Sequence, residues 1–240
     1  MDAYKLPDAI ILCGGLGTRL KDVQPDIPKI LTPVGDKVLL DILIGQIVSA
    51  GVNRIILSLG HLSEKVVEYV NIIDRSNIEI VNVIESKPLG TGGALKLACS
   101  KSQSDYFLVV NGDSYTDIKP SDLLKFHIRN KSFATMLAVK IKDIGQYGSV
   151  LVDSSGMIKS FEEKPTFKCT EGLINAGMYV FNRSILNEIK GGSMVSLEKD
   201  IFPSLIGNDF YAYISENKFL DIGTPTSFFE AEKFFSDVRS

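Results

Sequence analysis

The chain has 240 residues, 45% of them hydrophobic and 23% charged, which is an ordinary composition for a globular protein and enough for one large α/β domain. A formal net charge of −3, without a basic tail or stripe, argues against a nucleic-acid scaffold, and no apolar run approaches the ~20 residues of a membrane span. The three cysteines lack C-x-x-C spacing, and residues 1–8 lack the apolar core of a secretion signal. We therefore expect a cytoplasmic protein that binds neither nucleic acid nor membrane.

Residues 9–13 form the first predicted strand, because this apolar run is too short for a helix and rich in β-branched residues. Three glycines follow at once: Gly14, Gly15 and Gly17. Without Cβ atoms the backbone can turn sharply and bring its N–H groups close to phosphate oxygens. Arg19 and Lys29 then place two cations beyond the loop. The stretch therefore predicts a polyanion-binding site.

Two better-known glycine loops do not fit this stretch. The dinucleotide fingerprint G-x-G-x-x-G matches Gly15 and Gly17 but meets Leu20 where the third glycine is needed. A P-loop requires Gly-Lys-Ser/Thr, where this chain has Gly17-Thr18-Arg19. These mismatches disfavour a dinucleotide-dependent oxidoreductase and a P-loop protein.

The next segments alternate between strands and helices. The pattern predicts a helix at 38–50, a strand at 54–59, an exposed helix at 64–70 and a strand at 78–84. This alternation predicts a Rossmann-like, mostly parallel sheet with helices on both faces, and ligands bind such sheets beyond the carboxyl ends of the strands. A second cluster, Pro88-Leu89-Gly90-Thr91-Gly92-Gly93, lies at such an end. We expect the free N–H groups of the helix that it opens to point into the same crevice.

A buried strand at 106–110 is followed by Asn111, Gly112 and Asp113. The carboxylate of Asp113 therefore falls on the ligand side of the sheet. A Mg²⁺ ion would bind there, since it takes one or two carboxylates together with substrate phosphates and water. An aspartate in this place is otherwise most often a cap or turn residue.

The sequence changes character after a predicted helix at 121–130 and a strand at 134–141. Two short runs, 148–152 and 157–162, are joined by an Asp/Ser/Gly turn and predict a hairpin. Glu163-Lys164-Pro165 closes it. On composition alone, these charges would be a solvated turn.

The last part of the chain contains two further motifs. Asn175-Ala176-Gly177 lies in a predicted strand at 174–181, and helical patterns follow at 185–189 and 197–206. Phe219-Leu220-Asp221-Ile222-Gly223-Thr224-Pro225 then precedes a predicted final helix at 226–237, with Thr224 and Pro225 at its N-cap and first position.

Together these motifs resemble the signature of the sugar-1-phosphate nucleotidyltransferases. That family reads G-G-x-G-T-R-L with a following Pro-Lys, then P-L-G-T-G-G/A-A, G-D, E-K-P, N-A-G-x-Y-x-F and D-I-G-T-P, and the order is the same here. Departures from the pattern at Cys13, Ile30 and Phe219 remove no charged role. The resemblance implies the nucleotide-diphospho-sugar transferase fold, an α/β sheet with an inserted antiparallel sugar-binding region.

The resemblance also implies one domain over residues 1–240 and a role for each motif. The nucleotide-binding half would be about 1–140, the sugar-phosphate half about 141–225 and the C-terminal helix 226–240. Catalysis is assigned to Arg19, Lys29 and Asp113. Nucleotide binding is assigned to Leu12, Gly14, Gly15, Gly17, Thr18, Arg19, Glu85, Pro88, Leu89, Gly90, Thr91, Asn111 and Gly112. The sugar phosphate is assigned to Glu163, Lys164, Asn175 and Gly177. The expected cofactor, Mg²⁺, is assigned to Asp113 and Asp221.

The implied reaction is the attack of a sugar 1-phosphate oxygen on the α-phosphorus of a nucleoside triphosphate, with pyrophosphate leaving. Both substrates are anions, and two unit charges about 4 Å apart at an effective dielectric of about 20 repel by about 4 kcal/mol. Cations should therefore carry the catalysis. We expect Arg19 to act on the triphosphate, Lys29 on the α-phosphate and Lys164 on the sugar phosphate.

The residue before the second glycine cluster predicts the base. Guanine presents two adjacent donors, N1–H and the N2 amine, and an ionised Glu85 offers two acceptors to match them. Uracil and thymine would suit a glutamine better, and an exposed strand-end glutamate without any role is the simpler alternative. We expect GTP, and the resemblance favours a heptose 1-phosphate over mannose 1-phosphate or another hexose 1-phosphate.

Two other classes of protein are less favoured. A catalytically silent sugar-nucleotide sensor would be expected to have lost Arg19, Lys29 or one aspartate, and all are present. A hydrolase would need a serine or cysteine nucleophile motif, whereas His61 and His127 accompany none and fit surface or packing roles. The sequence leaves open whether the chain forms a homo-oligomer.

Overall fold

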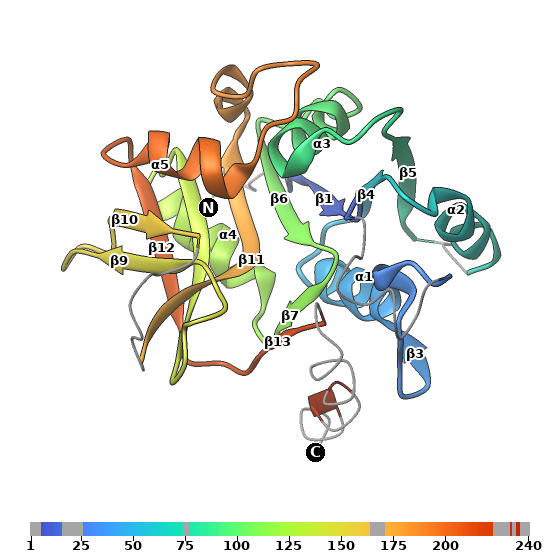
Figure 1. Cartoon of the computed structure of the whole chain (residues 1–240), viewed down its shortest axis with the longest axis horizontal. Helices are drawn as coiled ribbons and strands as arrows, with labels where there is room; N and C mark the ends of the chain where they lie inside the picture. The colour runs from blue at the N-terminus through green and yellow to red at the C-terminus, as the bar shows by residue number, and fades with distance from the viewer. Residues whose placement is uncertain are drawn as a thin grey trace.

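The computed structural model of the chain describes residues 6–15, 26–73, 77–163 and 171–222, together with 231, 234 and 235. Several predictions fall outside these residues: Gly17, Thr18, Arg19, Lys164 and most of the helix at 226–237. Figure 1 shows one large sheet with helices packed around it.

One half of the sheet is parallel and carries the loops of the predicted nucleotide site. Its strands are, in spatial order, β5 (Glu79–Ile84), β4 (Arg54–Leu59), β1 (Asp8–Leu12) and β6 (Tyr106–Asn111). Leu12 lies opposite both Ser58 and Asn111 in the parallel ladders. The loops after these strands therefore begin at one edge of the sheet, where ligands of parallel sheets bind.

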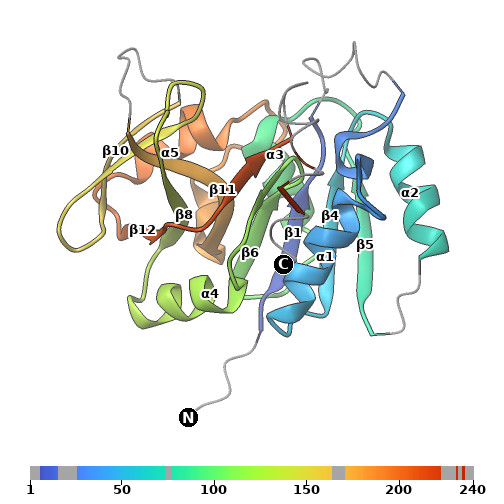
Figure 2. The same ribbon diagram turned by 90° about the horizontal axis from the view of Figure 1, so that it is seen from below.

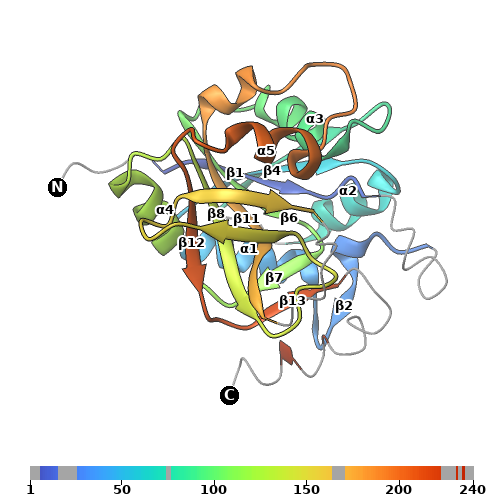
Figure 3. The ribbon, with the colours of Figure 1, turned by 60° about the vertical axis from the view of Figure 1, so that its left-hand side comes forward.

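The other half is built around β11 (Gly172–Asn182), which runs antiparallel to β6. On its far side β11 pairs with β8 (Ala134–Ile141), and β12 (Phe210–Ser215) lies parallel to β8. The hairpin of β9 (Ser149–Val152) and β10 (Ile158–Glu162) joins β11 through Leu173 and Ile174, and it lies in front of this half in Figure 3. The predicted α/β fold, with a parallel half and an inserted antiparallel region, is confirmed.

Helices cover both faces of the sheet, as Figure 2 shows. α1 (Leu39–Ser49), α2 (Ser63–Ile72) and α4 (Pro120–Arg129) bury their apolar faces in one core cluster. α3 (Gly90–Cys99) and α5 (Phe202–Leu205) contribute to a second cluster on the other side. Successive residues of β1 alternate between the two clusters, as side chains of a strand do. Within the described ranges, no helix has the length and apolar character needed to cross a bilayer.

Several short elements were not predicted. Besides β12, these are the ribbons β2 (Pro33–Val34) with β3 (Lys37–Val38) and β7 (Ser114–Thr116) with β13 (Phe219–Asp221), and the 3₁₀ turn Lys29–Leu31. Two predicted helices differ in type: 185–189 lies in a 3₁₀ turn, Arg183–Asn187, and 197–206 is a π-helix, Leu197–Ile201, that runs into α5. Strands of two or three residues carry no readable period, and a single π-helical turn is too short for its residue pattern to be told from that of an α-helix.

β11 changes partners along its length, and this irregularity lies at the predicted sugar motif. Its register with β8 shifts between Asn175 and Tyr179. Gly177 lies within the shift and has φ of +74°, a left-handed conformation that favours glycine. The sequence motif N-A-G therefore marks a bulge.

The two histidines have the surface and packing roles expected of them. His61 is exposed. His127 is buried on α4, with its Nδ1 2.9 Å from the Thr135 hydroxyl, and burial lowers its pKa to about 4. A neutral, buried imidazole of this kind supports packing.

Candidate active site

The first glycine loop begins where β1 ends and lies against the residue that follows β5. A Cβ atom on Gly14 would come within 2.7 Å of the Glu85 carboxylate oxygen Oε1. A Cβ atom on Gly15 would meet no described atom within 4 Å. Gly14 is therefore required by close packing against Glu85, whereas Gly15 leaves open space beside the backbone for a ligand.

Glu85 is half-buried and held in place. Its Oε2 accepts a hydrogen bond from the Leu89 N–H at 3.0 Å. Burial raises the pKa of its carboxyl group above the ordinary value, and the hydrogen bond from Leu89 partly opposes this rise. A fixed carboxylate between the two glycine loops does not match the alternative of a simply exposed strand-end residue.

The second glycine loop differs from the prediction in one respect. The N–H groups of Gly92 and Gly93 were expected to point into the ligand crevice, but both donate to the Val195 carbonyl, at 2.8 and 3.3 Å. The segment 193–197 packs on this turn and takes the donors that a free helix end would have offered to a ligand. The expectation about these two N–H groups is therefore wrong, while Pro88, Leu89, Gly90 and Thr91 stay predicted nucleotide contacts.

Lys29 and Asp113 meet at the carboxyl end of β6. Lys29 Nζ lies 3.2 Å from Asp113 Oδ2, although the two residues are 84 positions apart in the chain. Their side chains are 15% and 37% exposed, so both are partly open to solvent. Gly112 permits this approach, because a Cβ atom there would come within 2.9 Å of the Leu12 carbonyl oxygen. A cation and a carboxylate are thus placed beside the first glycine loop.

The second predicted metal ligand, Asp221, reaches the same place through the small ribbon of β7 and β13. Asp221 lies opposite Ser114, and the Ile222 N–H donates to the Asp113 carbonyl at 2.7 Å. Among the described residues no group of three or more His, Cys, Asp or Glu side chains could hold a metal. Backbone pairing thus brings the Asp113 and Asp221 positions close together, and one or two carboxylates are what Mg²⁺ typically takes beside substrate phosphates and water.

A buried tyrosine that the sequence analysis had not singled out contacts Asn175, one of the predicted sugar-facing residues. The Tyr179 hydroxyl accepts a hydrogen bond from Asn175 Nδ2 at 2.8 Å and also hydrogen-bonds to the Asn111 side chain. Burial raises the pKa of Tyr179 well above its ordinary value, and the charge of Glu198 adds to this rise. Asn175 Oδ1 accepts from the Gly177 N–H at 3.0 Å. Tyr179 therefore connects Asn111 at the end of β6 to Asn175 on β11.

Glu163 lies near the same end of the antiparallel half. Glu162 of β10 lies opposite Ser149 of β9, and Ser149 lies opposite Ile174 of β11. Glu163 follows Glu162 and Asn175 follows Ile174, so these two residues lie at the same level of the sheet. Glu163 Oε2 is 3.4 Å from Lys199 Nζ. Glu163 and Asn175 thus lie at a similar level of the sheet, on either side of β9, and their role in a sugar site stays a prediction.

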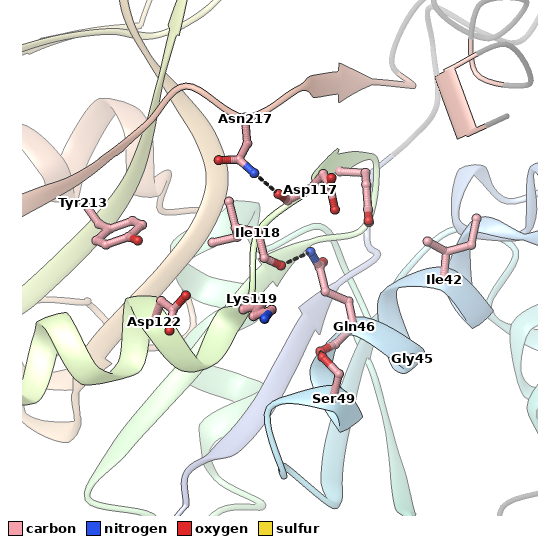
Figure 4. Close-up of a pocket in the computed structure, with 11 residues that line it drawn as sticks. Ile42, Gly45, Gln46, Ser49, Asp117, Ile118, Lys119, Asp122, Tyr213 and Asn217 are labelled. Atoms are coloured by element: carbon pink, nitrogen blue, oxygen red, sulfur yellow. Dashed lines mark hydrogen bonds between the residues drawn. The ribbon is translucent and has the colours of Figure 1, made fainter. Parts of the chain in front are cut away.

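A cavity of about 580 Å³ lies elsewhere, between α1, the turn after β7 and the segment before β13. Figure 4 shows Gln46 crossing it, with Nε2 donating to the Ile118 carbonyl at 2.9 Å. None of its lining residues is a predicted site residue, and its charged side chains are Asp117, Lys119 and Asp122. Its excess of negative charge makes it unsuitable for a triphosphate.

Tyr179, Ser114 and Glu198 are the residues at the site that sequence reasoning missed. Tyr179 is the tyrosine of the N-A-G-x-Y-x-F motif, and its neighbours Met178, Val180 and Phe181 are apolar. A polar hydroxyl among apolar strand residues could have indicated a buried hydrogen-bonding role. Glu198 lies in a segment predicted as an ordinary helix and contacts the second glycine loop only through the fold.

The parallel half, its glycine loop and the neighbouring lysine and carboxylates define a class of α/β enzymes that bind a nucleotide beside a second, antiparallel substrate region. The chain belongs to the nucleotidyl transferase family, whose model matches residues 8–238. The predicted family is thereby confirmed.

Individual relatives share much of this chain. It is 36% identical over 221 residues to D-glycero-alpha-D-manno-heptose 1-phosphate guanylyltransferase of Campylobacter jejuni, covering 92% of this chain and 96% of that protein. It is 33% identical over 226 residues to mannose-1-phosphate guanylyltransferase of Mycobacterium tuberculosis, covering 92% of this chain but 62% of that protein. The crystal structure of HddC from Yersinia pseudotuberculosis complexed with GMP-PN superimposes with a TM-score of 0.85 at 33% identity, covering 96% of this chain and all of HddC.

Proposed function

We propose that the protein is a guanylyltransferase that converts D-glycero-α-D-manno-heptose 1-phosphate and GTP to GDP-D-glycero-α-D-manno-heptose and pyrophosphate. The observation that carries the proposal is the Lys29–Asp113 pair at 3.2 Å beside the first glycine loop, with the fixed carboxylate of Glu85 at the other side of that loop. The heptose enzyme of Campylobacter jejuni, matched over nearly its full length, supports the choice of substrates. The reaction would take place in the cytoplasm and serve bacterial surface-polysaccharide synthesis.

In the proposed reaction the chain positions two anions for in-line displacement. A phosphate oxygen of the sugar 1-phosphate attacks the α-phosphorus, the bond from that phosphorus to the bridging oxygen breaks, and pyrophosphate leaves. Lys29 stabilises the charge that develops on the α-phosphate, and Arg19 holds the triphosphate. Glu163, Lys164, Asn175 and Gly177 hold the sugar phosphate. In this proposal residues 1–140 bind the nucleotide and 141–225 the sugar phosphate.

We assign Mg²⁺ to Asp113 and Asp221, whose strands the β7–β13 ribbon brings side by side. When bound, the ion would neutralise phosphate charge and help to orient the triphosphate. Asp113 and Asp221 would supply its carboxylate ligands, and Lys29, which lies beside Asp113, would act on the α-phosphate. The negative charge of the two carboxylates would attract the cation before the substrate phosphates bind.

Replacing Glu85 with glutamine is expected to weaken the preference for GTP over UTP and dTTP. The Leu89 N–H already donates to Oε2 of Glu85. The remaining lone pairs of the carboxylate can accept hydrogen bonds from the N1–H and the N2 amine of guanine. Because burial raises its pKa, the ionised form is lost at a higher pH than for an ordinary glutamate, so the KM for GTP should rise early as the pH falls. The measurement is kcat/KM for each nucleotide between pH 5 and 8.

Glu79→Gln is the matched control for this variant, since Glu79 lies at the opposite end of the same strand, paired with Arg54. It should keep the base preference of the wild type. An unchanged preference in Glu85→Gln itself would remove the proposed base contact.

The sugar preference is tested by kcat/KM for heptose 1-phosphate and mannose 1-phosphate, each with GTP. We expect the heptose to be preferred, because a pocket that hydrogen-bonds the extra exocyclic hydroxyl discriminates strongly against a sugar that lacks it. Mannose 1-phosphate is the second candidate, favoured by the match to the Mycobacterium tuberculosis enzyme. An equal or higher value for mannose 1-phosphate would overturn the heptose assignment and leave guanylyl transfer intact.

A further inference from the structure

The segment 193–199 packs directly on the first turn of α3. The Val195 carbonyl accepts the Gly92 N–H at 2.8 Å, and the Val195 N–H donates to the Leu89 carbonyl at 2.8 Å. A Cβ atom on Gly90 would come within 2.5 Å of the Val195 carbonyl oxygen, and one on Gly93 within 2.9 Å of the Ser193 carbonyl oxygen. Close packing against the 193–199 segment thus accounts for the glycines Gly90 and Gly93 in this turn.

Thr91 is the polar centre of this contact. Its hydroxyl donates to Glu198 Oε2 at 2.7 Å and accepts from the Leu197 N–H at 2.8 Å. Ser196 also donates to Glu198 Oε2, at 2.9 Å. The half-buried carboxylate thus receives two hydroxyl groups on one oxygen, and hydrogen bonds to a charged acceptor are stronger than neutral ones.

Glu198 occupies a position between the two substrate regions. On one side Glu198 binds Thr91, and two residues earlier in the same turn the Leu89 N–H donates to the Glu85 carboxylate at 3.0 Å. On the other side the charge of Glu198 acts on the Tyr179 hydroxyl, which holds Asn175. Glu198 lies in the π-helix Leu197–Ile201, and π-helical turns occur frequently at functional sites.

We propose that Glu198 is a positioning residue for base recognition: by accepting the Thr91 hydroxyl it fixes the turn 85–91 and so sets the orientation of the Glu85 carboxylate. This inference rests on the proposed function, in which Glu85 reads guanine. Glu198 itself need not touch the base. Removing its bond to Thr91 frees the turn, and the loss then appears in GTP discrimination more than in turnover.

The test compares Thr91→Val, Thr91→Ser, Glu198→Ala, Glu198→Gln and the double variant Thr91→Val/Glu198→Ala. Thr91→Val and Glu198→Ala should each lower the ratio of kcat/KM for GTP over UTP about tenfold, the scale of one lost charged hydrogen bond, mainly through the KM for GTP. The double variant should lose no more than Thr91→Val alone, because Thr91→Val already removes the contact with Glu198. Thr91→Ser and Glu198→Gln keep a donor and an acceptor oxygen and should restore the ratio.

Lys199→Ala is the matched control, since Lys199 lies next to Glu198 in the π-helix and is 65% exposed, with a surface ion pair to Glu163. It should leave the ratio unchanged. A second readout needs no activity: hydrogen–deuterium exchange in the ligand-free protein should rise at residues 85–93 in Glu198→Ala and Thr91→Val, and not in Lys199→Ala.

Unchanged exchange at residues 85–93 in Glu198→Ala would overturn the inference, and so would additive losses in the double variant. A wild-type enzyme without preference for GTP would instead contradict the proposed function. The exchange measurement would still decide whether Glu198 holds the turn. The rescue by Thr91→Ser and the melting temperature of each variant separate a positioning effect from failure to fold.

Discussion

Asp113→Asn and Asp221→Asn should each lose most of the transfer activity while the fold persists. Each removes one of the two negative charges assigned to Mg²⁺, and charge stabilisation of this kind is worth several kcal/mol, so kcat should fall by about a hundredfold or more. The fold should persist because the ion pair of Asp113 with Lys29 is partly exposed and contributes little to stability. The measurements are pyrophosphate release at saturating Mg²⁺ and thermal unfolding.

Asp117→Asn provides the control, since Asp117 is an exposed carboxylate just beyond β7. It should turn over normally. Near-normal turnover in a well-folded Asp113→Asn or Asp221→Asn enzyme would contradict the metal assignment.

Lys29→Ala is expected to depress kcat more than it raises KM. In the proposed mechanism the ammonium group stabilises the charge that develops on the α-phosphate in the transition state. Removing one such stabilising group lowers kcat by a factor of about 10²–10³. Lys29→Met is the companion variant, because the Lys29 side chain is only 15% exposed and methionine keeps much of its apolar stem. Steady-state kinetics with both substrates varied gives the two constants.

Lys37→Ala serves as its comparison, since Lys37 is an exposed lysine on the nearby strand β3. It should behave like the wild type. A change confined to KM in both Lys29 variants would make Lys29 a residue that binds ground state and transition state equally.

The parallel half of the fold could be predicted because each of its strands is a short apolar run followed by a loop with a distinctive composition. That rule places Gly14, Glu85 and Asp113 at one edge without coordinates, and the ladders of β1 with β4 and β6 bear this out. The predicted family is likewise confirmed by the match over residues 8–238. Residue patterns predict the structure well where strand, loop and helix follow one another directly along the chain.

Contacts between distant segments could not be predicted in this way. Nothing in residues 88–93 indicates that Val195 would take the N–H groups of Gly92 and Gly93, so a helix end that looked free for a ligand is occupied by the chain itself. The ribbon of β7 and β13 has only three residues on each side, which is too short for a period. Tyr179 was visible in the sequence, but its link between Asn111 and Asn175 depends on the bulge in β11.

β11 also limits how the enzyme can move. Its residues 178–182 pair with β6 of the parallel half, and Leu173 and Ile174 pair with β9 of the antiparallel half. A hinge opening between the halves would have to break the β6–β11 ladder, which lies in the middle of the sheet and carries buried side chains such as Val180 and Phe181. The sheet therefore joins the two halves in one continuous frame, and we expect substrates to enter and products to leave through rearrangement of the loops at its edge.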